Sequence, residues 1–201
     1  MIRNKIFFLL IFLFVFSIQS FSQKIIVNVF AENKKANSSS DTIYYDFNRR
    51  LSWNDFKGKP DENFFAGAVT ASGFAFNAEM NFDGRNIYLN IGVFTFFTKN
   101  DSWHKPEINS AYHLLHEQHH FDITKIGSER FIDELQKAHF TKENYNKVIE
   151  SIFNKVYKEN EDLQKQYDKE TMHSINVDKQ NEWNDKIASE IQKLKVTASN
   201  L

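Results

Sequence analysis

The run Leu114-Leu115-His116-Glu117-Gln118-His119-His120-Phe121-Asp122 contains two histidines four residues apart, with a glutamate directly after the first. Residues at positions i and i+4 lie on one face of a helix, so the imidazoles of His116 and His120 can bind one metal ion. Glu117 lies near the same site and can act as a base toward a water molecule. The pattern predicts a zinc hydrolase site, and the alternative is a polar helix face that carries histidines by coincidence.

The residues around this run are typical of a helix from 106 to 135. Pro106 suits a first helical position, and Glu107 places negative charge in the first turn. Apolar residues recur at roughly helical spacing, at Ile108, Ala111, Tyr112, Leu115, Ile123, Ile126, Phe131 and Leu135. The metal pattern therefore falls in the middle of the predicted helix, where its geometry is retained.

The rest of the chain divides into strands before this helix and helices after it. Strands are predicted over 66–76 and 86–97, with Asp83-Gly84 as the hairpin turn between them. Thr141 can cap a helix over 142–164, whose inward residues are Tyr145, Val148, Ile149, Ile152, Phe153 and Val156. A loop over 167–176 and a last helix over 177–194 follow. The sequence predicts an α+β fold, an N-terminal antiparallel sheet followed by packed helices.

The first twenty-two residues have the character of a signal peptide. A basic start is followed by an apolar stretch over 6–18 and by Ser20-Phe21-Ser22, which supplies small residues where a signal peptidase cuts. We expect cleavage between Ser22 and Gln23 and a periplasmic or secreted protein with no stable membrane anchor. A retained anchor is the alternative, but the apolar stretch is short for a bilayer span. Residues 23–42 are predicted to be a disordered leader, and residues 43–201 a single metallohydrolase domain.

The composition excludes several classes of protein. The formal net charge is −1 and both signs are mixed along the chain, which argues against binding to nucleic acid or to an acidic membrane surface. The chain has no cysteine, so neither a lipid-modified cysteine nor a disulfide framework is available. An exported chain of this length can be stable on its core alone.

A catalytic zinc ion needs three protein ligands and one open position, so a third ligand must come from outside the two histidines. Glu129 lies nine residues beyond His120, roughly half a turn out of phase on the helix, and cannot reach the metal. The segment 167–174 is rich in suitable groups, and we rank them in the order His173, Glu170, Asp168.

Two further residues have alternative roles. Tyr167 can donate a hydrogen bond to a developing oxyanion or can simply pack in the core. His113 precedes His120 by seven residues and returns to nearly the same helix face. It can therefore line a substrate cleft or contact a metal ligand.

These residues together favour a zincin-like, zinc-dependent metallopeptidase in which Glu117 is the general base. A peptide or protein substrate could bind in extended form to a strand edge near the metal. The alternative is a non-catalytic envelope binding protein with a structural metal site, closed by both His173 and Asp168. A third possibility is a fold that binds no metal.

Three segments and a short piece of the C-terminal region resemble a bacterial family described as predicted zinc-dependent proteases, the domain of unknown function numbered 922. The segments are Leu51 to Asp61, His116 to Ile123 and Tyr167 to His173, and the short piece is Gln180-Asn181-Glu182-Trp183. The resemblance spans about residues 44–194. It implies metal or catalytic roles for His116, Glu117 and His120, and site residues at Asp168 and His173.

Overall fold

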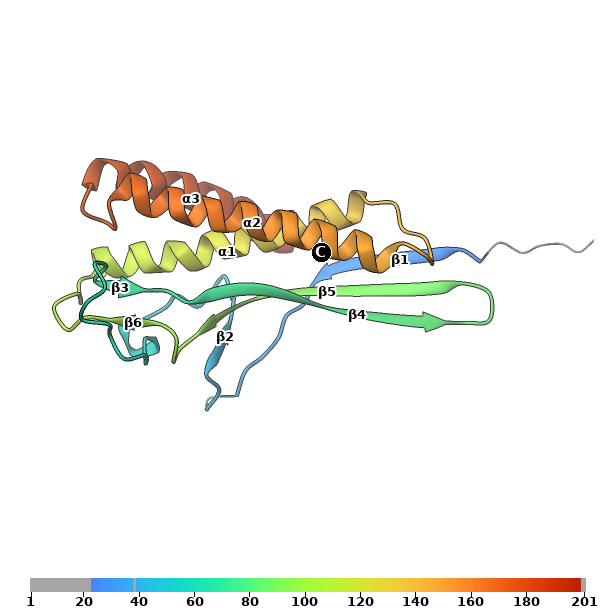
Figure 1. Cartoon of the computed structure of the whole chain (residues 1–201), viewed down its shortest axis with the longest axis horizontal. Helices are drawn as coiled ribbons and strands as arrows, with labels where there is room; N and C mark the ends of the chain where they lie inside the picture. The colour runs from blue at the N-terminus through green and yellow to red at the C-terminus, as the bar shows by residue number, and fades with distance from the viewer. Residues whose placement is uncertain (1–22, 38, 200–201) are drawn as a thin grey trace, which may run out of the picture.

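The computed structural model describes residues 23–37 and 39–199, so the predicted signal peptide, residues 1–22, lies outside the described residues. Three long helices cover one face of a β-sheet (Figure 1). The predicted α+β class is confirmed. The helices are α1 (Ala111–Lys137), α2 (Tyr145–Thr171) and α3 (Val177–Ser199).

The sheet is built around β5 (Ile87–Thr98). β4 (Ser72–Phe82) pairs antiparallel with one edge of β5, and β1 (Ile25–Ala31) and β2 (Thr42–Tyr44) share the other edge. β2 is antiparallel to β5, but β1 is parallel to it, so the sheet is mixed. The prediction of a purely antiparallel sheet was therefore wrong for β1, because the chain reverses between β1 and β2 and both strands reach the same edge.

Part of the predicted disordered leader is the first strand of the sheet. Ile25, Val27 and Val29 alternate with residues on the other face, and Val29 is buried in the main hydrophobic cluster while the other two pack against it. These side chains fill the space between the sheet and the helices. The prediction of disorder over 23–42 therefore fails for β1, because this apolar alternation gives the segment a face to bury.

The predicted hairpin is confirmed between β4 and β5, but its first strand runs over 72–82 and not over the predicted 66–76. Gly84 at its turn has φ of 91°, a conformation that favours glycine. The Asp83 carboxylate accepts hydrogen bonds from the main-chain N–H groups of Arg85 and Asn86. A second small sheet joins β3 (Ala68–Val69) to β6 (Trp103–His104) and lies before the start of α1.

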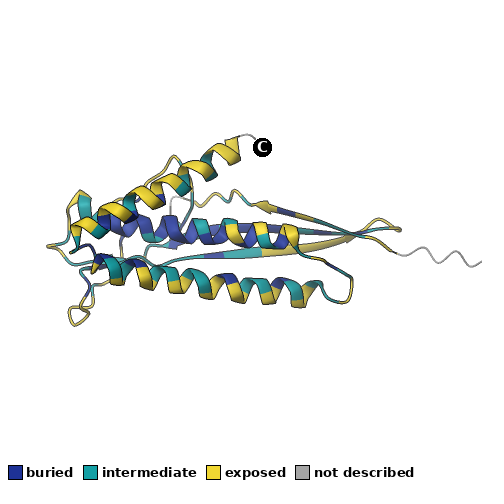
Figure 2. Ribbon diagram, turned by 90° about the horizontal axis from the view of Figure 1, so that it is seen from above, coloured by how far each residue is buried: buried dark blue, intermediate teal, exposed yellow. Residues whose placement is uncertain are grey.

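Helix α1 lies between α2 and α3 and is the most buried of the three (Figure 2). It begins at Ala111, because Ser110 is its N-cap and accepts a hydrogen bond from the N–H of His113. The predicted start at Pro106 was five residues too early. Among the described residues, no helix has the length and apolar character needed to cross a membrane.

Helix α2 continues seven residues beyond the predicted end at Gln164 and stops at Thr171. The stretch from 165 to 171 contains neither glycine nor proline, so nothing in it ends the helix. The first half of the predicted loop over 167–176 is therefore helical, and the connection to α3 shrinks to residues 172–176. As a result, Tyr167, Asp168 and Glu170 project from the last turns of a helix.

Candidate metal centre

His116 and His120 lie one turn apart on the face of α1 that meets α2. Their ring centroids are 5.0 Å apart, and the rings are almost perpendicular, at 86°. His116 is buried and His120 is nearly so. The helical spacing read from the sequence therefore brings the two imidazoles together.

Asp168, in the last turn of α2, supplies a carboxylate to the same point. Its Oδ1 lies 3.2 Å from Nε2 of His116 and 3.0 Å from Nε2 of His120. One possible ligand atom from each of the three residues lies within 4.8 Å of the others, so the group could hold a metal ion. Two imidazole nitrogens and one carboxylate oxygen are a ligand set found in catalytic zinc sites.

The second nitrogen of each imidazole is fixed by a glutamine. Nδ1 of His116 lies 2.8 Å from Oε1 of Gln180, and Nδ1 of His120 lies 2.6 Å from Oε1 of Gln164. The amide nitrogen of Gln164 donates to the carbonyl of His120, and that of Gln180 to the hydroxyl of Tyr167, so both amide oxygens are left to accept from Nδ1–H. Such outer hydrogen bonds set the tautomer of metal-binding histidines.

This tautomer turns the lone pairs of both Nε2 atoms toward an anionic oxygen of Asp168. Lone pairs and a carboxylate repel one another unless a cation, either a proton or a metal ion, lies among them. Burial by itself would lower the pKa of His120, but the hydrogen bond and charge of Asp168, the charge of Glu117 and the bond to Gln164 raise it to about 9. The site therefore attracts positive charge.

The pKa of Asp168 is shifted in the opposite direction, downward. Burial by itself would raise the pKa of its carboxyl group, but hydrogen bonds to His116 and His120 and their charges hold the pKa well below its usual range. The carboxylate is therefore ionised at neutral pH and is available as an anionic ligand.

Glu117 is oriented by a residue that the sequence did not single out. The hydroxyl of Thr70, just after β3, donates to Oε2 of Glu117 over 2.6 Å. Glu117 is buried, yet it lines a cleft of about 620 Å³. The same cleft is lined by His116, His120 and Asp168, here called the metal group. The base predicted from the sequence therefore stands beside the candidate ligands and faces the same open space.

The predicted ranking of the third-ligand candidates differs from the arrangement of these residues around the two histidines. Asp168, ranked last, is the residue that converges on both histidines, whereas Nδ1 of His173 lies 3.3 Å from Asp168 Oδ1 at the cleft rim. The side chain of His173 is 33% exposed. Glu170 accepts a hydrogen bond from Trp183 on α3, because two further residues along α2 turn it away from the metal face.

Of the two roles considered for Tyr167, its position fits packing in the core. It is fully buried, and its ring stacks on that of His116 with centroids 4.6 Å apart. Its hydroxyl donates to the carbonyl of His116 and accepts from Gln180, so it does not point into the cleft as an oxyanion donor would. His113 lines the cleft, and its Nδ1 lies 2.7 Å from the hydroxyl of Ser110.

No model of a protein family matches the chain, and comparisons with curated proteins and with solved structures found no match. The chemistry of the site is therefore inferred from its own side chains.

The opposite face of α1 carries a buried polar network centred on Asp122. Its carboxylate accepts hydrogen bonds from Tyr45, Arg50 and Gln118 and lies 3.1 Å from Nδ1 of His119. Burial of Asp122 would raise its pKa, but the bond to His119 and the charge of Arg50 lower it. The network ties the segment before β3 to the helix that carries the candidate ligands.

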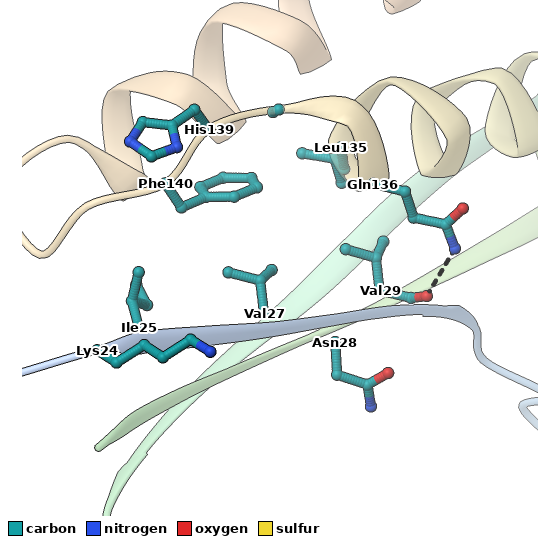
Figure 3. A pocket seen from close by; sticks show the side chains of 10 residues that line it. Lys24, Ile25, Val27, Asn28, Val29, Leu135, Gln136, His139 and Phe140 are labelled. Atoms are coloured by element: carbon teal, nitrogen blue, oxygen red, sulfur yellow. Dashed lines mark hydrogen bonds between the residues drawn. The ribbon is translucent and has the colours of Figure 1, made fainter. Parts of the chain in front are cut away.

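A second hollow of about 530 Å³ lies at the far end of α1, between β1 and the connection from α1 to α2 (Figure 3). Its apolar walls include Val27, Leu135 and Phe140, and Gln136 donates to the carbonyl of Val29 at its edge. Its charged or titratable side chains are Lys24 and His139. These two do not form a metal-binding group, so the cleft beside α2 is the better candidate for a functional site.

Proposed function

We propose that the chain is an exported, zincin-like metallopeptidase that hydrolyses peptide bonds. His116, His120 and Asp168 would hold the metal, and Glu117 would be the general base. The observation that carries the proposal is the convergence of one carboxylate oxygen on two Nε2 atoms, beside a glutamate in an open cleft. Zinc is the metal of choice because imidazole ligands suit it and a cleft leaves a position open. The resemblance to family 922 remains a prediction that agrees with this assignment.

A bound zinc ion would polarise the scissile carbonyl and lower the pKa of a coordinated water to about 7. Glu117 would take a proton from the attacking water and pass it to the leaving amine. Thr70 would keep the carboxylate of Glu117 aimed at the cleft, through the 2.6 Å hydrogen bond to Oε2. Gln164 and Gln180 would keep the Nε2 atoms of the histidines turned toward the metal.

The edge of β3 supports a peptide as the substrate. The N–H of Lys105 donates to the carbonyl of Gly67, and Ala68 and Val69 pair with β6 beyond them. Main-chain groups alternate in direction along an antiparallel strand, so those of Ala68 point away from β6. Ala68 and Thr70 both line the cleft. An extended peptide could therefore add to this edge and lie across the metal group.

A structural metal site is the second candidate. It is favoured by His173, whose Nδ1 lies 3.3 Å from Asp168 Oδ1, since a fourth protein ligand would close the site. A closed site would bind zinc but would not hydrolyse peptides, so the same assay separates the two candidates.

The test is a Glu117→Gln variant of residues 23–201, loaded with zinc and assayed on a labelled unstructured protein such as casein. Peptide cleavage should fall by roughly 10²- to 10⁴-fold, the usual contribution of general base catalysis, while zinc content stays at the wild-type level. Glu129→Gln is the matched control, because Glu129 pairs with Lys125 away from the cleft. Full activity in Glu117→Gln would rule out the mechanism, and an inactive wild type with tightly bound zinc would favour the structural site.

A further inference from the structure

Large apolar side chains gather at one end of the cleft, although they are in contact with solvent. Phe65 and Ile175 are 74% and 75% exposed, Met172 is 55% exposed and Phe64 is 40% exposed. All four line the cleft that contains the metal group. They come from two separate loops, one before β3 and one between α2 and α3. Exposed apolar groups clustered at a cleft mark a surface that binds something.

One of these loops is held in a strained conformation. Met172, His173 and Ser174 are three consecutive residues with positive φ, at 50°, 51° and 70°. This conformation is unfavourable for residues other than glycine and persists only where the surroundings impose it. The hydroxyl of Tyr112 donates to the carbonyl of Ser174, and the N–H of His173 donates to the carbonyl of Asp168. The loop is therefore a fixed wall, formed before any ligand arrives.

The other loop meets this wall at the cleft rim. The ring of Phe65 packs edge-on against that of His173, with centroids 4.8 Å apart, and Phe64 packs against Phe65. Lys105 donates from Nζ to the carbonyl of Phe64, which anchors the loop at its base. The two loops thus form an apolar recess that is continuous with the metal group through His173 and Asp168.

The opposite end of the same cleft has a mixed lining. Asn160, Glu161 and Lys165 of α2 line it together with Phe74 and Tyr157. A peptide that crosses the metal would therefore meet four exposed apolar side chains on one side of the scissile bond and charged side chains among aromatic ones on the other.

The direction of β3 decides whether the N-terminal or the C-terminal half of a bound peptide faces the apolar end of the cleft. Thr70 stands beside Glu117, and the chain runs backward from there through Ala68 to Phe65 at the apolar end. Antiparallel pairing is slightly more stable per residue than parallel pairing. A peptide added antiparallel to β3 has its C-terminal half toward Phe65.

We infer that the cleft selects peptides with a large apolar side chain on the C-terminal side of the scissile bond, received between Phe65, Met172 and Ile175. This inference rests on the proposed peptidase function. It names the class of substrate, and it explains why four large apolar side chains are left uncovered at this place.

Two pairs of peptide hydroxamates test the inference on the zinc-loaded protein, residues 23–201, without requiring turnover. A hydroxamate binds zinc, so it fixes the position of the attached peptide relative to the metal. In the first pair the peptide extends from the hydroxamate in the C-terminal direction and carries Leu or Ala. In the second pair it extends in the N-terminal direction and carries the same residues. Binding is measured by calorimetry.

In the first pair, the Leu compound should bind at least about tenfold more tightly than the Ala compound, which corresponds to about 1.4 kcal/mol. The preference should be lost in a Phe65→Ser, Ile175→Ser double variant. It should be retained in Phe82→Ser, since Phe82 is exposed on β4 and does not line the cleft. The second pair should show no such preference.

Equal binding of the first pair would overturn the inference while leaving the metal site intact. A Leu preference in the second pair alone would also overturn it. If neither pair binds zinc-loaded protein, the proposed metal site itself fails, and the inference fails with it.

Discussion

Removing the metal should make the stability of the protein fall as the pH rises from 6.5 toward 9. In the metal-free protein the imidazole of His120 lies 3.0 Å from Asp168, and its pKa is raised from 6.5 to about 9. A pKa that is higher in the folded state means that folding favours the protonated form. The resulting stabilisation is complete below pH 6.5 and is lost as the pH passes through about 9.

The size of the effect follows from the same two pKa values. A pKa raised from 6.5 to about 9 corresponds to a change on the order of 3 kcal/mol in the free energy of unfolding. This is a large part of the roughly 5–15 kcal/mol that stabilises a typical domain. Tyr45 and Tyr167, whose pKa values are also raised by burial, ionise only above 10 and do not contribute in this range.

The assay is urea unfolding of chelator-treated protein at a series of pH values, followed by circular dichroism. Asp168→Asn is the matched variant, because it keeps the shape of the side chain and removes the charge that raises the pKa of His120. We expect the variant to lack most of the fall in stability between pH 6.5 and 9. Zinc should reverse the trend in the wild type, since metal binding needs neutral imidazole. Equal stability of the metal-free wild type at both pH values, or the same fall in Asp168→Asn, would refute the reasoning.

Two further predictions concern single side chains. Thr70→Val removes the hydroxyl that orients Glu117, so kcat should fall about tenfold with zinc content unchanged, and Thr70→Ser should restore most of it. A kcat equal to wild type in Thr70→Val would show that Thr70 does not orient the base. Phe131→Ala should lower the free energy of unfolding by about 3–5 kcal/mol, because Phe131 is fully buried. Urea unfolding measures this change, and Phe82→Ala, at an exposed position, should lower it by less than about 0.5 kcal/mol.

The part of the site that lies on one helix could be predicted from the sequence. The four-residue spacing of His116 and His120 is enough to place both imidazoles on one face once the segment is helical. The hairpin at Asp83-Gly84 could be predicted for a similar reason, since its turn residues and its flanking alternation are local features. Each of these predictions depends on residues that are near one another in the chain.

The geometry of the candidates for the third ligand could not be predicted, because it depends on where α2 ends. A loop at 167–176 leaves the direction of Asp168 open, whereas a helix that reaches Thr171 turns Asp168 toward α1, with His173 beyond it at the cleft rim. One signal was available. Val156, Asn160, Gln164 and Asp168 follow one another at intervals of four, which marks a single face of a continuous helix. The last three are polar, and they contact the metal face of α1.

Side-chain contacts between segments far apart in the chain could not be predicted from the sequence. Asp122 accepts a hydrogen bond from Arg50, seventy-two positions earlier in the chain. Thr70 and Gln180 likewise reach the site from elements whose packing the pattern of residues does not specify. Such pairs are fixed by the arrangement of the helices on the sheet.

The most direct test of the central claim is zinc binding by the wild type beside Asp168→Ala and His173→Ala, measured by competition with a chromogenic chelator. We predict about one zinc ion per chain in the wild type, a loss of affinity of at least about 100-fold in Asp168→Ala, and a change of less than about tenfold in His173→Ala. Affinity that is unchanged in Asp168→Ala and lost in His173→Ala would contradict the assignment of the third ligand. Failure of the wild type to bind zinc would contradict the metal centre as a whole.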